Sequence, residues 1–232
     1  MEKNNSNEYR DLTSLSGTLK IFLGLYIVIS FAAIWSESME LDLLNRAYQG
    51  EYITDEEIIA NDDRQAFVGG LYFLIFLITS IIFLRWKYIS NKNARSLGIV
   101  DMEFTPGWSV GWYFIPIANL WKPYQALKEI FKASNPEYTD NWKLAEYPSI
   151  LPLWWMLWLL TSFIGNIVLN MMFRTETIEQ FITMSWLYIF SDILGVPLGI
   201  IVITLVSKLQ EWQSAKYHQQ VFAGHKEYLI ES

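Results

Sequence analysis

The chain has 232 residues, of which 52% are apolar and 16% aromatic, and its formal net charge is −7. It contains no cysteine, which excludes disulfides, thiolate zinc sites, iron–sulfur clusters and cysteine nucleophiles. Both histidines, His218 and His225, are close to the C-terminus, so we expect no histidine-ligated metal inside a membrane. The negative charge argues against general nucleic-acid binding. The 11 tryptophans favour a membrane protein, because Trp and Tyr gather at membrane–water interfaces.

Four apolar segments predict transmembrane helices, since about 20 helical residues cross the hydrocarbon layer. They cover about residues 15–35, 66–84, 149–173 and 183–206. The first contains Lys20, whose ammonium group can reach the headgroups. A signal peptide is the alternative for this first segment, but no clear small-residue cleavage site follows it. The sequence therefore predicts an all-α fold, a bundle of four transmembrane helices.

Lysine and arginine residues predict the orientation of this bundle. With both termini in the cytoplasm, fourteen of the 17 Lys and Arg residues lie inside and three outside. The positive-inside rule favours this arrangement. We expect residues 1–232 to form a single membrane domain, with a cytoplasmic layer made of residues 85–148 and 207–232.

Residues 36–65 are predicted to form a helical hairpin outside the membrane. Gly50 is a plausible end for its first helix, and Thr54 with Glu57 forms a capping box that starts the second. The hairpin carries nine acidic and two basic residues. It is either a solvated acidic surface or a mouth that concentrates cations or binds a basic partner.

On the cytoplasmic side, residues 108–121 are uncharged but short for a span, and Pro116 interrupts them. We therefore expect an interfacial or re-entrant segment here. Thr105 and Pro106 should open a short helix before it. Gly98 and Gly224 are expected to end the extensions of the second and fourth transmembrane helices.

A further helix is predicted to begin at Pro123, because proline suits the first turn and removes a backbone donor elsewhere. Its sequence, PYQALKEIFKAS, is amphipathic and carries three lysines suited to anionic headgroups. One interpretation is an interfacial amphipathic helix. The alternative is a re-entrant element in which Asn119 satisfies backbone groups freed by Pro116 and Pro123.

This region resembles a known family. The run GWYFIPIANLWKPYQALKEIFKAS at 111–134, followed by WWMLWLL at 154–160, is similar to the bacterial membrane family called domain of unknown function 4328. The family's aromatic–Ile–Pro–x–x–Asn–Leu–x–x–Pro–Tyr run is matched by Phe114, Ile115, Pro116, Asn119, Leu120, Pro123 and Tyr124. The resemblance covers about residues 65–210 in layout. It implies a multi-pass protein of the bacterial plasma membrane and supplies no activity.

Five residues of this run are candidate functional residues: Trp112, Pro116, Asn119, Pro123 and Tyr124. The resemblance marks this run as specific to the family. The prolines would set the break in the backbone. We therefore expect substitutions at Pro116, Asn119 or Pro123 to reduce activity more than expression if the break serves function.

Asp192 is the one acid deep in a predicted span, near the midplane, where an ionisable group is a functional candidate. Gly195 and Gly199 share its helix face and form a GxxxG pair, which allows close helix packing. On the third span, Asn166 and Asn170 form a similar polar stripe, and we expect Asn166 to hydrogen-bond to Asp192. This group is either a polar clamp between two helices or a proton or cation site.

Catalytic motifs are lacking in the sequence, with no Ser–His pair in the spans, no His–Glu metal motif and no phosphate-binding glycine loop. We expect no catalytic residue, cofactor or metal, and no enzyme. The leading hypothesis is a non-catalytic module that senses or transmits a signal, or scaffolds a partner, through its cytoplasmic layer. The alternative is a homo-oligomeric ion channel or small transporter. Expected partners are the lipid bilayer, a second copy of the chain and a protein at the cytoplasmic face.

Overall fold

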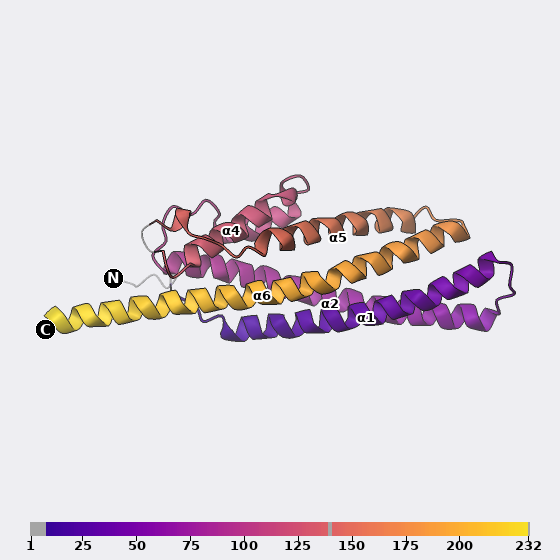
Figure 1. The fold of residues 1–232 in the computed structure, drawn as a ribbon, viewed down its shortest axis with the longest axis horizontal. Helices are drawn as coiled ribbons and strands as arrows, with labels where there is room; N and C mark the ends of the chain where they lie inside the picture. The colour runs from indigo at the N-terminus through magenta and orange to yellow at the C-terminus, as the bar shows by residue number, and fades with distance from the viewer. Residues whose placement is uncertain (1–7, 139–140, 232) are drawn as a thin grey trace. The chain divides into compact units, whose positions relative to one another are not determined.

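The computed structural model describes residues 8–138 and 141–231, with side chains through Ala223, and is all-helical over these residues (Figure 1). The four long helices are α1 (Thr13–Tyr48), α2 (Asp55–Ser96), α5 (Leu151–Met172) and α6 (Ile178–Glu231). Two shorter helices are α3 (Pro106–Gly111) and α4 (Lys122–Ser134). Three short 3-10 turns cover Trp112–Phe114, Ala118–Leu120 and Trp142–Leu144.

The four long helices are apolar enough to cross a membrane, at the four places predicted from the sequence. Their most apolar stretches are largely uncovered by the rest of the protein. In α2 only 11% of that stretch is buried. Apolar surface of this extent needs an apolar environment, so the helices imply a lipid bilayer and suggest an integral membrane protein.

The chain packs into two units, which are described separately. Unit 1 contains Met1–Lys20, Ile81–Leu153 and Ile203–Ser232, and unit 2 contains Ile21–Ser80 and Trp154–Val202. Helices α1, α2 and α6 each contribute a stretch to both units.

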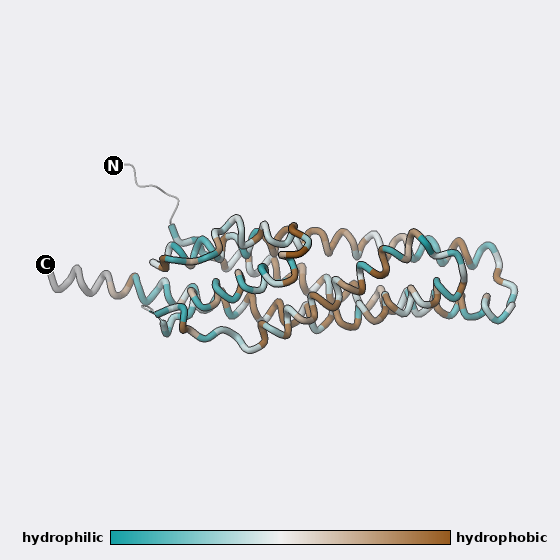
Figure 2. The backbone as a smooth tube through the Cα atoms, turned by 90° about the horizontal axis from the view of Figure 1, so that it is seen from above, coloured by the Kyte–Doolittle hydropathy of each residue, from teal (hydrophilic) through white to brown (hydrophobic). Residues whose placement is uncertain are grey.

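In unit 2, α1 and α2 are joined by the predicted turn, where polar residues gather in Figure 2. Gly50 adopts φ +82°, a left-handed conformation that glycine tolerates at a helix end. The Thr54 N–H donates to Glu57 Oε2 at 3.1 Å, and the Glu57 N–H donates to Thr54 Oγ1 at 3.2 Å. The capping box is therefore confirmed. Arg46 of α1 adds an ion pair to Glu57 at 2.7 Å, which ties the two helices together beside the turn.

In unit 1, the apolar face of α4 forms part of the core. Leu127, Ile130 and Phe131 are at most 1% exposed. The Phe131 ring packs edge-on against Trp212 of α6, with centroids 5.9 Å apart. The expectation of an interfacial amphipathic helix at α4 is therefore wrong, because protein rather than lipid covers this face.

The predicted helix starts around α3 and α4 are confirmed. The Thr105 hydroxyl accepts a hydrogen bond from the Trp108 N–H at 3.3 Å, and Pro106 occupies the first turn of α3. After Gly111 the helix gives way to 3-10 turns on either side of Pro116, and α4 has Pro123 in its first turn.

The two predicted glycine stops have different outcomes. Gly98 follows the end of α2 and adopts φ +80°, as predicted. Helix α6 instead continues through Gly224 to Glu231, so a stop at Gly224 is wrong. A glycine inside a helix costs only about 1 kcal/mol, and it ends a helix only where the backbone turns left-handed.

Candidate functional site: an acidic cavity in unit 2

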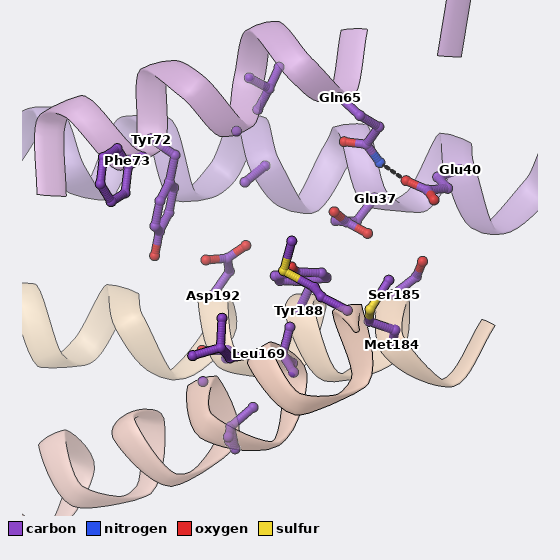
Figure 3. Close-up of a pocket in the computed structure, with 18 residues that line it drawn as sticks. Glu37, Glu40, Gln65, Tyr72, Phe73, Leu169, Met184, Ser185, Tyr188 and Asp192 are labelled. Carbon is purple, nitrogen blue, oxygen red and sulfur yellow. Dashed lines mark hydrogen bonds between the residues drawn. The ribbon is translucent and has the colours of Figure 1, made fainter. Parts of the chain in front are cut away.

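Unit 2 contains a cavity of about 620 Å³ between α1, α2, α5 and α6 (Figure 3). Its volume falls within the range of about 300–1,000 Å³ that is usual for small-molecule pockets. The apolar part of its wall comes mainly from α5 and includes Ile164, Val168 and Leu169. The polar part comes from α1, α2 and α6. The cavity therefore has the mixed lining typical of a binding site.

Three carboxyl groups line the cavity. Asp192 comes from α6 and is 7% exposed, whereas Glu37 and Glu40 come from α1. Figure 3 shows Asp192 and Glu37 directed into the same space from facing helices. No lysine, arginine or histidine is among the described residues that line it. The lining therefore offers carboxyl groups without a basic residue beside them, and a bound cation would favour their ionised form.

The two glutamates differ in their hydrogen bonds. Glu40 accepts a hydrogen bond from the Gln65 side-chain amide, the dashed line in Figure 3. The Glu37 carboxyl group lies within hydrogen-bonding reach of Ser185, but its buried Oε2 atom has no hydrogen-bond partner within the described part of the chain. A buried oxygen of this kind costs free energy until a donor reaches it. Glu37 therefore offers an acceptor for a ligand or an ordered water.

The nearest arginine is bound elsewhere. The Arg64 guanidinium donates to Asn61 Oδ1 and, through Nε, to Ser36 Oγ at 3.2 Å. It does not line the cavity. The Arg64 side chain therefore bonds to Asn61 and Ser36 rather than to Glu37 or Glu40.

A pair of tyrosines lies beside Asp192. The hydroxyl groups of Tyr26 and Tyr72 are 2.9 Å apart. Tyr72 points from α2 toward Asp192, and its hydroxyl lies within hydrogen-bonding reach of the carboxyl group (Figure 3). The partner of Asp192 is thus a tyrosine of α2, so α1, α2 and α6 are joined through polar groups.

The asparagines of the third span do not take part in this site. The Asn166 side-chain amide donates to Ser162 O at 3.3 Å, and that of Asn170 donates to Asn166 O at 2.7 Å. Both side chains are exposed, and neither lines the cavity. The expected Asn166–Asp192 hydrogen bond is absent, because the polar stripe of α5 bonds to its own backbone.

Gly195 and Gly199 lie against α1. A Cβ atom added at Gly195 would be 2.7 Å from the Tyr26 hydroxyl oxygen, and one at Gly199 would be 3.0 Å from Ile27 Cγ1. In both cases the neighbouring side chain belongs to α1 of the same chain, so the GxxxG pair packs α6 against α1. The glycine pair therefore accommodates side chains of α1 next to the cavity.

The other candidates, in the family-specific run, belong to unit 1. Pro123 O accepts a hydrogen bond from the Lys87 ammonium group at 2.8 Å. Trp112 Nε1 and Asn119 Oδ1 are buried without a hydrogen-bond partner among the described residues. The Asn119 carbonyl therefore does not stabilise the break in the way expected. Tyr124 and Pro116 lie in the same stretch, half-buried and exposed respectively.

Sequence reasoning missed Glu37, Glu40, Gln65 and Tyr72 as site residues. It counted Glu37 and Glu40 only as part of an acidic hairpin. A usable signal was the spacing of three between them, which places both on one face of a continuous helix. Nothing in the sequence shows which face of α2 turns toward Asp192.

The fold and the cavity define an all-helical protein with four helices that could span a membrane and an acidic pocket among them. The chain belongs to the family described as Domain of unknown function (DUF4328), which matches residues 49–211. The resemblance noted from the sequence is thereby confirmed. No curated protein and no solved structure matches the chain.

Proposed function

We propose that this protein is a non-catalytic membrane sensor that binds a cationic ligand in the acidic cavity and signals through its cytoplasmic layer. One observation carries the proposal. Glu37, Glu40 and Asp192 line a single cavity that has no cationic lining residue among the described ones. Carboxyl groups gathered in a low-dielectric site are stabilised by a bound cation.

The cavity supports an organic ammonium ion as the ligand class. At about 620 Å³ it has room for several non-hydrogen atoms beyond a metal ion. The aromatic rings of Tyr72, Phe73 and Tyr188 are part of the lining and can attract a cation through their faces. Carboxyl groups for the charge and rings for the carbon atoms suit an alkylammonium ion.

The helix continuity supports a relay to unit 1. Glu37 lies on α1, Tyr72 on α2 and Asp192 on α6, and each of these helices also contributes a stretch to unit 1. Small shifts of packed helices are a common way to couple distant sites. A ligand that draws the three polar groups together would therefore favour one helix packing over another.

We further propose a topology. Residues 85–148 and 207–232 form a layer at the cytoplasmic side together with both termini, residues 36–65 lie outside, and the membrane is the bacterial plasma membrane. The uneven distribution of Lys and Arg supports this orientation. Single cysteines at Gln49 and Thr177 should react with an impermeant maleimide on intact cells, whereas cysteines at Gln125 and Gln219 should react only after lysis. All four side chains are exposed, and external labelling at Gln125 would overturn the topology.

An ion channel or small transporter is the second candidate, favoured by the same carboxyl groups near Asp192. Purified protein in liposomes separates the two functions. A sensor gives no flux of protons, sodium or tetraethylammonium above that of empty liposomes. Flux that the wild type supports and the Asp192→Asn variant lacks would replace the sensor with a channel or transporter.

A further inference from the structure

One buried lysine, Lys87, makes hydrogen bonds to both ends of an eleven-residue loop of the chain. The Lys87 ammonium group donates to Pro123 O at 2.8 Å and to the Tyr113 hydroxyl at 3.3 Å. Lys87 is 0% exposed. We call residues 113–123 the Lys87 loop. Its two ends are fixed to the same point on α2, so the position of Lys87 determines where the loop begins and ends.

That point lies at the end of an apolar span. The apolar segment 66–84 stops three residues before Lys87, about 4.5 Å along the helix at 1.5 Å per residue. The Tyr113 ring packs edge-on against Phe83, in the last turn of that segment, with centroids 6.4 Å apart. The ends of the Lys87 loop therefore lie at the level where α2 leaves its apolar stretch.

The loop turns its apolar side chains outward. Phe114 and Ile117 are 71% and 72% exposed, and Leu120 is 54% exposed. No charged residue occurs between Trp108 and Trp121. Single exposed apolar residues are ordinary, but a contiguous uncharged patch of this kind marks a contact surface.

The backbone of the loop suits an apolar environment, in which unpaired polar groups are costly. The N–H groups of Asn119, Leu120 and Trp121 donate to carbonyl oxygens of the same loop at 2.8, 3.1 and 3.2 Å. Pro116 has no N–H group to satisfy. These backbone N–H groups of the loop are therefore satisfied by hydrogen bonds within the loop itself.

We propose that the Lys87 loop inserts Phe114, Ile117 and Leu120 into the bilayer leaflet at the Phe83 end of α2. The inference rests on the bilayer implied by the four apolar helices and is independent of the cation sensor. The occupant is lipid because the loop is held level with the end of a membrane span, with Trp108 shortly before the loop and Trp121 near its end. Tryptophan prefers the headgroup level of a bilayer.

Site-directed spin labelling tests this directly in the full-length, naturally cysteine-free protein. A label at Ile117 in phosphatidylglycerol–phosphatidylethanolamine nanodiscs should be more accessible to oxygen than to a polar nickel chelate. Its depth should be about 5–10 Å below the headgroups. The matched control is a label at Leu144, which is 75% exposed in the same unit but outside the loop. That label should favour the nickel chelate.

Two outcomes would overturn the proposal. Equal nickel accessibility at Ile117 and Leu144 would place the loop in water. A label at Ile117 that is immobile and protected from both reagents would place protein over the loop. If spin–spin broadening disappears on mixing with unlabelled protein, that cover is a second copy of this chain. Both positions are exposed, so the cysteine substitutions leave the core unchanged.

Discussion

Gly195 of α6 lies so close to Tyr26 of α1 that a methyl group at residue 195 would be 2.7 Å from the tyrosine hydroxyl oxygen. That hydroxyl is hydrogen-bonded to Tyr72 at 2.9 Å. The Gly195→Ala variant must therefore move the Tyr26 ring, which has no flexible chain to bend. We expect a loss of about 1–3 kcal/mol, the usual cost of overpacking, measured by denaturant titration in micelles.

Gly24→Ala is the control, because a Cβ atom there would meet nothing within 4 Å. It should keep or raise stability by up to about 1 kcal/mol, as alanine favours a helix over glycine. An equal loss in both variants would mean that helix flexibility, rather than the Tyr26 contact, explains the effect.

Gln213 joins three segments of unit 1. Its side-chain amide donates to Ser90 O at 2.8 Å and to Ser134 Oγ at 2.9 Å, and its carbonyl oxygen accepts from Asn93 Nδ2 at 3.1 Å. The Gln213→Leu variant removes these three hydrogen bonds from the core, so we expect a loss of about 1–3 kcal/mol in the free energy of unfolding. Thermal unfolding in nanodiscs measures it. Gln219→Leu, on the exposed face of the same helix, should change the midpoint little.

Glu129 predicts a pH dependence in unit 1. Burial raises the pKa of this carboxyl group, although it accepts hydrogen bonds from the N–H groups of Glu103 and Phe104. The folded protein then binds the proton more tightly than the unfolded chain. The contribution to stability is fully present below the ordinary pKa of 4.5 and is lost as pH rises through the raised pKa.

Thermal midpoints between acidic and neutral pH test this. The wild type should lose more stability across that interval than Glu129→Gln, whose side chain does not ionise. Glu137→Gln, at an exposed position, serves as the control and should follow the wild type. If the thermal midpoints of the wild type and Glu129→Gln change equally with pH, the pH dependence does not come from Glu129.

The local features of this fold were readable from the sequence because each depends on neighbouring residues. Residues close together in the sequence determine the apolar segments, the Thr54–Glu57 capping box and the Thr105–Pro106 helix start. Gly98 and Gly224 show the limit. Both glycines satisfy the same stop signal, but only Gly98 ends a helix, because packing decides whether the backbone turns left-handed there.

The candidate site was harder to predict because it depends on which helix faces meet. Asp192 was singled out by its depth in a span, and it does line the cavity. Matched positions in a hairpin of α5 and α6 predict Asn166 as its partner. The structure instead brings Tyr72 from α2 to Asp192 and Glu37 from α1 to the same cavity. Helix rotation about its own axis selects these partners, and a single sequence carries little information about it.

The acidic cavity predicts cation binding that depends on Asp192. Tetraethylammonium titrated into protein in nanodiscs should give saturable heat in isothermal calorimetry. Asp192→Asn should weaken the affinity about tenfold or more, since an interaction with a charged group contributes about 1.5–3 kcal/mol. Asp63→Asn removes one charge from an exposed position of the same unit and should leave the affinity unchanged. If both variants bind tetraethylammonium with equally weakened affinity, the effect comes from the net charge of the protein and not from the cavity.

Hydrogen–deuterium exchange in unit 1, with and without tetraethylammonium, tests most directly whether this protein is a sensor. We predict that the ligand changes amide exchange in residues 99–138, on α3, α4 and their connections, although these residues do not line the cavity. Asp192→Asn should abolish that change, and Asp63→Asn should retain it. Protection confined to residues around Glu37, Tyr72 and Asp192, with exchange in unit 1 unchanged by saturating ligand, would contradict the relay and the proposed function.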